Sequence, residues 1–221
     1  MVGHGLELSL GSPQLNEGYL TQLEHLLGHA GMVWHGDHLC LTETPHLAIR
    51  ALTPLPMVEE AVTVVAQNTQ RVKARLGRPL VVENIAYAVS WPMNVLDEAS
   101  FVAKTLVESD VGWLLDLHNL YANALNFGFD PYAVLARMPL DRVIQIHLAG
   151  GETLDGLYLD THGRLTPPEV WRMLEYVAPR CAVRGVNLEM DSQFPAFEVL
   201  LEELAHARTI LNRHGVARAT L

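Results

Sequence analysis

Short apolar segments alternate with longer amphipathic segments along this chain. Six of the short segments have the length of strands, and they cover residues 4–10, 32–41, 79–84, 113–118, 143–149 and 186–189. Runs such as residues 80–82 and 113–115 are apolar without a polar residue between. Strands that are covered on both faces lack the polar alternation of half-exposed strands, so these segments predict a parallel sheet.

The segments between the predicted strands have the spacing of amphipathic helices. We expect helices over residues 15–27, 58–76, 97–108, 170–177 and 195–213, and a further helix that begins at Asp130-Pro131. Asp130-Pro131 and Thr166-Pro167 fit helix starts, because a capping side chain followed by proline is a common N-terminal signal. Gly77 and Gly215 are expected to end the helices that precede them.

The repeated order of strand and helix predicts an α/β fold with a TIM-barrel-like parallel sheet. A closed barrel of this kind has eight strands, whereas about six can be recognised here, so the predicted barrel can be incomplete. Neither a linker nor an internal repeat divides the 221 residues. We therefore expect a single domain over residues 1–221.

Composition and charge exclude several classes of protein. Apolar residues make up 49% and charged residues 18%, which excludes a disordered chain. The sequence has neither an apolar stretch of membrane-spanning length nor a secretion signal, so we expect a cytoplasmic protein without membrane contact. Two cysteines exclude a disulfide scaffold, and the net charge of −10 argues against binding to nucleic acid.

Histidine and carboxylate residues gather at the ends of the predicted strands, where parallel α/β folds carry their reactive groups. Several carboxylates on one rim would repel one another unless a cation lay between them. Imidazole and carboxylate together form the ligand set of zinc, iron and manganese. We therefore predict two or three metal ions, bound by His4, His38, Glu83, Asp116, His118, His147, Asp160, His162, Glu189 and Asp191.

The spacing of these residues refines the prediction. Asp116 and His118 are two positions apart, which on a strand places both side chains on one side. The same spacing separates Asp160 from His162, which are expected on a loop, and Glu189 from Asp191. Any one of these residues alone is more commonly structural, so only the joint pattern indicates metal binding.

The other histidines receive different predictions. His35 is ambiguous, because its distance of three positions from His38 points it to the opposite face of the strand. The remaining ones are expected at the surface; they are His25, His29, His46, His206 and His214.

Several features fit other chemistry less well. Gly3-His4-Gly5 and Gly150-Gly151 are too short for phosphate-binding loops and are expected where backbone segments approach closely. Cys40 is expected in the core. Asp116 and Glu189 could form the acid/base pair of a glycoside hydrolase, but the surrounding histidines favour metal binding.

An ordered set of motifs resembles one family of enzymes. The set comprises His4-Gly5 with residues 8–12, Asp37-His38-Leu39, Pro54-Leu55-Pro56, residues 76–79 running into Glu83-Asn84, residues 114–121 and 126–131, residues 146–150, residues 160–163 with Val170-Trp171, and Glu189-Met190-Asp191 with Pro195. Over essentially its whole length the chain resembles the multinuclear non-heme iron-dependent oxidative enzymes.

This resemblance implies a xylose-isomerase-like TIM barrel that holds two or three iron ions, with zinc or manganese as possible substitutes. It implies seven ligands, namely His4, His38, Glu83, Asp116, His147, Glu189 and Asp191, and it assigns Asp160 and His162 to a third ion. Glu83, Asp116 and His118 are the expected catalytic residues. Many members have asparagine at the position of His118, so the histidine is a departure from the family pattern.

The resemblance also implies a substrate and partners. Characterised members use O2 to modify cysteine residues of ribosomally made peptides, often with a partner protein that delivers the precursor peptide. The family has about two further strands before the position of His4. We therefore expect an unpaired sheet edge here and, from it, a homodimer.

Three other functions stay open at this point. A divalent-metal-dependent sugar isomerase or epimerase could use Glu83 and Glu189 for proton transfer. A trinuclear zinc endonuclease has a similar ligand set, although the acidic charge disfavours it. A non-catalytic scaffold that binds metal or peptide is the third alternative.

Overall fold

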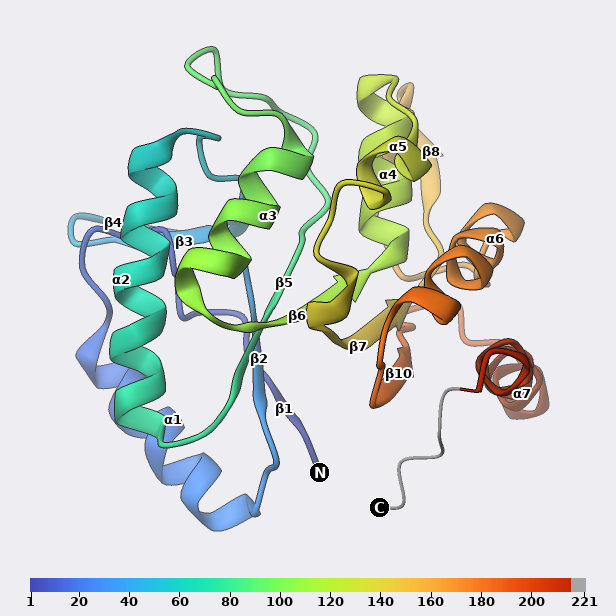
Figure 1. Cartoon of the computed structure of the whole chain (residues 1–221), viewed down its shortest axis with the longest axis horizontal. Helices are drawn as coiled ribbons and strands as arrows, with labels where there is room; N and C mark the ends of the chain where they lie inside the picture. Colours follow the sequence, from blue (N-terminus) through green and yellow to red (C-terminus); the bar gives the residue numbers. More distant parts are fainter. Residues whose placement is uncertain (216–221) are drawn as a thin grey trace. The chain divides into compact units, whose positions relative to one another are not determined.

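A computed structural model describes residues 1–215 of the chain (Figure 1). Within these residues the main sheet has six strands, in the order β1 (Gly3–His4), β2 (His35–His38), β5 (Leu80–Glu83), β6 (Gly112–Asp116), β7 (Val143–Leu148) and β10 (Gly185–Leu188). The pairs β1–β2, β2–β5 and β7–β10 are parallel. The predicted α/β fold with a parallel, TIM-barrel-like sheet is confirmed, with six strands in place of eight.

The described residues contain seven α-helices, of which α7 follows the last strand and the others lie between strands. They are α1 (Glu17–Ala30), α2 (Glu59–Leu76), α3 (Glu98–Ser109), α4 (Leu117–Phe127), α5 (Pro131–Leu135), α6 (Pro168–Val177) and α7 (Phe197–Arg213). Asp130 caps α5 as predicted, and Gly77 ends α2 with a φ of 59°. Helix α6 begins at Pro168, before the expected range of 170–177, and Pro167 takes the N-cap position that the pattern gave to Thr166.

The predicted strands over residues 4–10 and 32–41 were too long. Strand β1 ends at His4, and the chain then turns at Ser9, which has a φ of 50°. The Ser9 hydroxyl accepts hydrogen bonds from the backbone N–H groups of Thr42 and Glu43, which holds this turn in place. Strand β2 ends at His38, and a separate hairpin follows it.

Two short antiparallel hairpins were not predicted. One consists of β3 (Leu41–Thr44) and β4 (Leu47–Thr53), and the other of β8 (Glu152–Leu154) and β9 (Leu157–Leu159). The second turns at Asp155-Gly156, where both residues have positive φ angles of 50° and 83°. An Asp-Gly pair between short apolar runs is a hairpin signal, so the sequence did contain a cue for it.

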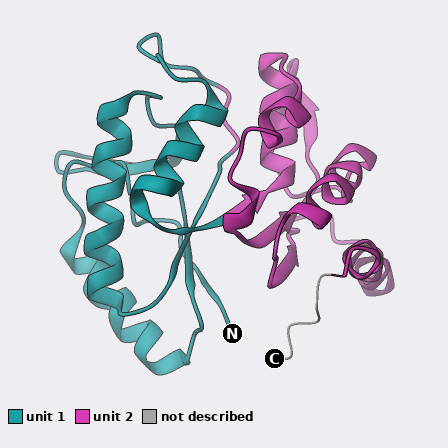
Figure 2. Cartoon of the chain, viewed as in Figure 1, with its two compact units in different colours: residues 1–85, 89–113 teal, residues 86–88, 114–221 magenta. Residues whose placement is uncertain are grey.

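The chain forms two compact units (Figure 2). Unit 1 comprises residues 1–85 and 89–113, and unit 2 comprises residues 86–88 and 114–221. The expectation of a single domain stays a prediction.

Unit 1 has strands β1, β2 and β5 and helices α1, α2 and α3. Helix α2 packs against both α1 and α3 (Figure 1). The buried side chains of these helices include Leu20, Leu23, Leu27, Val62, Val65, Val72, Phe101, Val102 and Leu106. Their spacing of three and four residues is that of helices with one apolar face, so burial of that face stabilises the unit.

Unit 2 is built around α4. This helix packs against β7, α6 and the β8–β9 hairpin, and α7 packs against α6 and β10. The core of the unit includes Leu117, Leu120, Leu135, Ile146, Leu148, Val170, Met173 and Leu174. This packing positions the ends of β7 and β10 and the segment after β9, where several of the predicted ligands lie.

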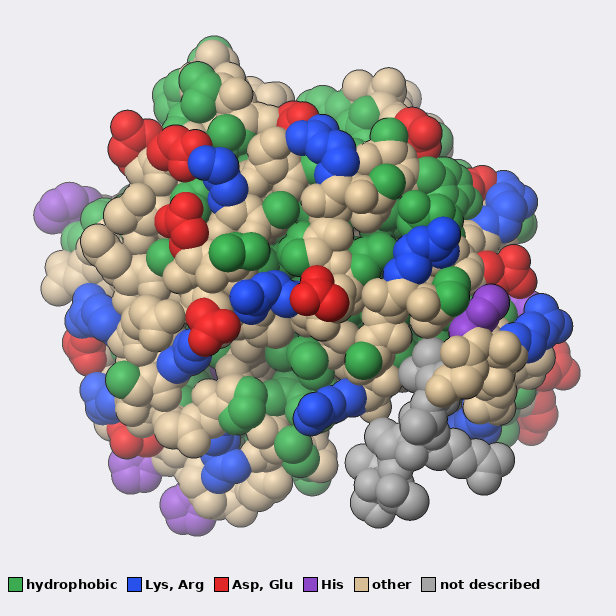
Figure 3. All heavy atoms as spheres, viewed as in Figure 1, with side chains coloured by type: hydrophobic (Ala, Val, Ile, Leu, Met, Phe, Trp, Pro, Cys, Tyr) green, Lys and Arg blue, Asp and Glu red, His purple; other side chains and the backbone are tan. Residues whose placement is uncertain are grey.

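The surface charge and the length and polarity of the helices can be compared with what the composition predicts. On the face shown in Figure 3, lysine and arginine side chains are interspersed with acidic and apolar ones. Among the described residues, no helix is both long and apolar enough to cross a membrane.

Candidate metal centre

Three of the predicted ligands meet within unit 1, at the ends of adjacent parallel strands. His4 ends β1, His38 ends β2 and Glu83 ends β5. The Nε2 atom of His4 lies 2.9 Å from Oε2 of Glu83, and Nε2 of His38 lies 3.4 Å from the same oxygen. The structure therefore brings these three residues together, as the strand-end pattern predicted.

The histidines of this group are oriented by their surroundings. Nδ1 of His38 lies 3.0 Å from the backbone carbonyl oxygen of Gly5, so its Nε2 faces Glu83. The Glu83 side chain is only 2% exposed, whereas that of His4 is 25% exposed. A buried carboxylate that faces two imidazole nitrogens is the arrangement expected of a metal ligand group.

A second group lies in unit 2 and consists of Asp116, His147 and Glu189. Asp116 is the last residue of β6, His147 is the last but one residue of β7, and Glu189 directly follows β10. One ligand atom from each of the three lies within 4.8 Å of the others. Nδ1 of His147 is 3.2 Å from Oε1 of Glu189, and its Nε2 is 2.9 Å from the side-chain amide of Gln145. Asp116 and His147 are fully buried.

A third group, also in unit 2, consists of His118, Asp160 and His162. Nδ1 of His118 and Nε2 of His162 each lie 2.9 Å from Oδ1 of Asp160. The remaining nitrogens of both rings are also engaged: Nε2 of His118 lies 3.2 Å from the hydroxyl of Tyr158, and Nδ1 of His162 lies 3.0 Å from Oδ2 of Asp191. Asp160 and His162 lie on a loop, as predicted.

The ionisation of this third group follows from its contacts. Burial alone would raise the pKa of Asp160, but hydrogen bonds from His118 and His162 outweigh it and lower the pKa to about 2. Burial would lower the pKa of His162, but the hydrogen bond and charge of Asp160, followed by the charges of Glu189 and Asp116, raise it to about 9. Asp160 is thus held as an anion, the form in which carboxylates bind metals.

The prediction that Asp116 and His118 lie on one strand was wrong. Strand β6 ends at Asp116, and His118 lies in the first turn of α4. The Asp116 side chain accepts a hydrogen bond of 2.7 Å from the backbone N–H of Asn119, which makes it the N-cap of that helix. Because the chain turns into a helix at this point, the two side chains do not share a strand face.

The donor set fits a metal. The imidazole and carboxylate groups above are mostly buried, and each of four histidines, at 38, 118, 147 and 162, has one ring nitrogen near a carboxylate and the other near a further polar group. Metal-binding histidines commonly have this second contact, since it orients the ring. The assignment of the ten predicted residues as ligands stays a prediction.

The other histidines lie where the sequence placed them. The five that were expected at the surface are exposed. His35 is buried, and its Nε2 lies 3.6 Å from Oδ2 of Asp37. It therefore faces a different carboxylate from the one that His38 faces.

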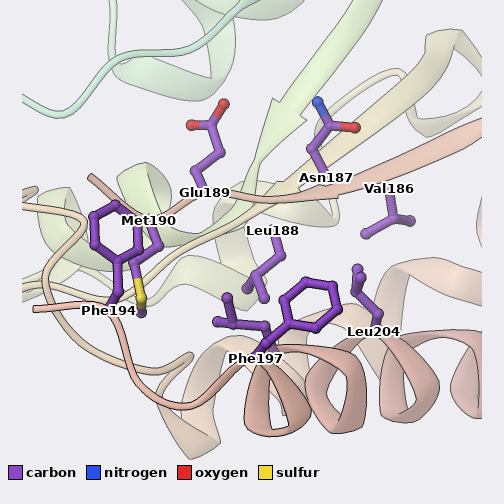
Figure 4. Close-up of a pocket in the computed structure, with 9 residues that line it drawn as sticks. Val186, Asn187, Leu188, Glu189, Met190, Phe194, Phe197 and Leu204 are labelled. Carbon is purple, nitrogen blue, oxygen red and sulfur yellow. The ribbon is translucent and has the colours of Figure 1, made fainter. Parts of the chain in front are cut away.

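A cavity of about 440 Å³ opens beside β10 and α7 in unit 2 (Figure 4). Most of its lining is apolar and includes Leu188, Phe194, Phe197 and Leu204. In Figure 4 the side chain of Glu189 points away from these apolar side chains. The strand segment thus presents an apolar side to the cavity and a polar side that carries Glu189.

The sequence analysis missed two residues that contact the predicted ligands. Tyr158 was missed because it lies on β9, in a hairpin that was not predicted. Gln145 was missed because it lies inside β7, two positions before His147 and on the same side of the strand. The Asp-Gly turn was the cue for the first, and the two-residue spacing was the cue for the second.

The sequence of the chain is similar to those of known proteins. The model of a family described as "RiPP precursor modification enzyme MbnB/TglH/ChrH" matches residues 1–212 of the chain. The chain belongs to this family. The family comprises enzymes that modify the precursors of ribosomally made peptides, so the resemblance found in the motifs is confirmed at this level.

Relatives and solved structures agree with this assignment. A UPF0276 protein of Acaryochloris marina is 39% identical over 212 residues, which are 96% of this chain and 77% of the relative. A UPF0276 protein of Caulobacter vibrioides is 37% identical over 215 residues, with the same two coverages. A xylose isomerase domain containing protein of Salmonella typhimurium has a TM-score of 0.62 at 16% identity and is covered over 75% of its length, against 95% of this chain. The structural likeness shows the fold.

Proposed function

We propose that this protein uses two or three iron ions and O2 to modify cysteine residues of a ribosomally made precursor peptide. Membership of a family of peptide-precursor modification enzymes supports the peptide substrate. One group of imidazole and carboxylate side chains in unit 1 and two such groups in unit 2 each support metal binding, and so support more than one ion. The ordered motifs that resemble the iron-dependent oxidative enzymes support iron and O2 in particular.

One observation carries this proposal. Three buried histidines each face a carboxylate with one ring nitrogen and a second polar group with the other, namely Gly5 at His38, Gln145 at His147 and Tyr158 at His118. If these histidine–carboxylate pairs were only structural, nothing would require all three histidines to have a second polar contact that orients the ring. The proposed ligands are nine of the ten predicted residues, namely His4, His38, Glu83, Asp116, His118, His147, Asp160, His162 and Glu189. For the tenth, Asp191, we propose that its contact with Nδ1 of His162 orients that ring.

The bound iron would supply the redox chemistry with O2, and the residues of the chain prepare the place for it. Imidazole and carboxylate ligands suit an ion that changes oxidation state. Full burial of Asp116 and His147 keeps water away from those ligands. Of the proposed catalytic residues, Glu83 offers one oxygen to two histidines, Asp116 is fixed by its helix-capping bond, and His118 is held between Asp160 and Tyr158.

The proposal is tested by metal analysis and oxygen uptake. Protein from iron-replete cells, purified anaerobically, is expected to hold two or three iron ions per chain. It is expected to consume O2 with a cysteine-containing precursor peptide and not with the same peptide carrying serine in place of cysteine. His147→Ala should lose iron and activity, whereas the matched variant of an exposed histidine, His46→Ala, should keep both.

Two outcomes would contradict the proposal. Stoichiometric zinc as the only metal after iron-replete expression would remove the redox chemistry. Sugar epimerisation that proceeds with Mn²⁺ in the absence of O2 would favour the alternative of a metal-dependent isomerase or epimerase.

We further propose the partners that the resemblance implies. These are a protein that delivers the precursor peptide, and a second copy of this chain in a homodimer. We also propose that the protein acts in the cytoplasm. Co-purification of a tagged chain with proteins encoded beside its gene would test the first of these partners.

A further inference from the structure

Tyr158 is held in place from several sides within unit 2. The side-chain amide of Asn126 donates to the backbone carbonyl of Tyr158 at 2.9 Å, and the carbonyl oxygen of that amide accepts from the backbone N–H of Tyr158 at 2.8 Å. The backbone N–H of Gly151 donates to the Tyr158 hydroxyl at 3.1 Å. The ring makes an edge contact with Tyr121 at a centroid distance of 5.4 Å. These contacts therefore fix the position of the Tyr158 hydroxyl oxygen.

This fixed oxygen lies 3.2 Å from Nε2 of His118, the ring nitrogen that faces away from Asp160. The His118 side chain is fully buried. Its other nitrogen, Nδ1, lies 2.9 Å from Oδ1 of Asp160, and Nε2 of His162 lies at the same distance from that oxygen. The three atoms that could hold an ion are thus Nδ1 of His118, Oδ1 of Asp160 and Nε2 of His162.

We propose that Tyr158 is a positioning residue that makes Nδ1 the metal-binding atom of His118. A neutral imidazole binds a metal through the nitrogen that carries no proton, and its other nitrogen then needs an acceptor for its N–H. The Tyr158 hydroxyl oxygen can be that acceptor. When an ion replaces the Nδ1–H contact with Asp160, the remaining proton then resides on Nε2, and the lone pair of Nδ1 is left for the ion. This inference rests on the proposed function, because it concerns one of the ions of that centre.

The backbone around His118 fits the same role. A Cβ atom on Gly151 would lie 1.9 Å from the carbonyl oxygen of Leu159 and 3.1 Å from Cε1 of His118. Only glycine allows this segment to approach both the β9 strand and the imidazole ring while its N–H donates to Tyr158. Gly151 therefore supplies both one of the contacts that fix Tyr158 and the space that admits the ring of His118.

The test compares Tyr158→Phe with Tyr132→Phe, which also loses a hydroxyl hydrogen bond, to Glu169, elsewhere in unit 2. Each protein, freed of metal, is dialysed anaerobically against graded Fe²⁺, and bound iron is measured. Tyr158→Phe is expected to weaken the binding of one equivalent of iron by about 10- to 100-fold, the usual effect of losing such an outer contact. The remaining iron in Tyr158→Phe is expected to bind with wild-type affinity. The binding curve of Tyr132→Phe is expected to match that of the wild type throughout.

A double-mutant comparison shows whether Tyr158 acts through His118. Asparagine at position 118 can offer one ligand atom to the group but has no second ring nitrogen for Tyr158. In a His118→Asn background the additional change Tyr158→Phe should therefore alter iron binding less than twofold. An unchanged effect of Tyr158→Phe in that background would overturn the inference, since the tyrosine would then act by another route.

The outcomes separate the inference from the proposed function. Wild-type protein that binds iron while folded Tyr158→Phe binds it equally well would overturn the inference alone. Wild-type protein that binds no iron would overturn both. As a second readout, the visible absorption spectrum of the Co²⁺-loaded protein should change in Tyr158→Phe and not in Tyr132→Phe, because only the first alters a ligand.

Discussion

The imidazole ring of His162 lies between two carboxylates. Its Nε2 is 2.9 Å from Asp160, and its Nδ1 is 3.0 Å from Asp191. Asp191 was predicted as a ligand because it follows Glu189 by two positions. In the structure it contacts the ring edge that faces away from Asp160, and its side chain is 77% exposed. These observations favour a role in orienting His162.

Two substitutions of Asp191 distinguish orientation from direct binding. Asparagine keeps an oxygen that accepts the Nδ1–H bond, so Asp191→Asn should keep iron affinity within about threefold, whereas Asp191→Ala should lower it about tenfold. Equilibrium dialysis against Fe²⁺ measures both, with the exposed Glu202→Gln as the control. If Asp191 binds iron itself, the asparagine variant will lose as much affinity as the alanine variant.

Residue types at strand ends predicted which side chains come together, and the sequence alone could not predict what holds them. His4, His38 and Glu83 lie at or near the ends of predicted strands, so their meeting follows from a parallel sheet. The carbonyl of Gly5 and the hydroxyl of Tyr158 are ordinary groups whose role depends on tertiary contacts. Gly150 and Gly151 were expected at close backbone approaches, and Cβ atoms there would lie 2.2 Å and 1.9 Å from backbone oxygens.

At the scale of elements, the junction of β6 and α4 decides where two candidate residues lie. Asp116 is both the last residue of the strand and the N-cap of the helix. Its side chain satisfies one of the free N–H groups at the start of α4. The sequence analysis extended the strand over this point, because an apolar run alone does not distinguish the end of a buried strand from the start of a buried helix.

Helix α2 is joined to the segment after β1 by one buried side chain. The amide of Asn68 donates to the backbone carbonyl of Leu10 at 2.9 Å and to that of Ser12 at 2.7 Å. Asn68→Leu should lower the free energy of unfolding by about 2–3 kcal/mol, because two buried carbonyl oxygens lose their donor. Urea unfolding measures this, with Gln67→Leu on the exposed face as control. If Asn68→Leu and Gln67→Leu lower the free energy of unfolding equally, the loss comes from placing leucine in helix α2 and not from the buried hydrogen bonds.

The elements that were predicted best are those with strong local signals. Helices α1, α2 and α3 have apolar stripes and clear ends, including Gly77 with its positive φ. The boundaries of β1 and β2 were missed because the turn at Ser9 depends on hydrogen bonds to the β3 strand, far along the chain. Local pattern thus predicts an element, while its exact ends depend on distant partners.

At the scale of the whole molecule, exposed apolar side chains lie beside the last strand of the sheet. Strand β10 ends the strand order within the described residues. Phe194 and Phe197 line the cavity beside it and are 66% and 67% exposed. Exposed apolar groups beside a sheet edge favour association with another chain, so this edge is a candidate interface for the homodimer that was predicted from an unpaired sheet edge.

The predicted homodimer is tested by sedimentation velocity over a hundredfold range of protein concentration. If β10 and α7 form the interface, Phe197→Glu should shift the protein to monomer, because it places a charge in an apolar contact. A glutamate at the start of α7 is favourable for the helix itself, so the fold should be preserved. Leu125→Glu, at an exposed residue of α4, is the matched control and should leave the association unchanged. A wild-type chain that stays monomeric at every concentration would refute the dimer, and a dimer that persists in Phe197→Glu would place its interface elsewhere.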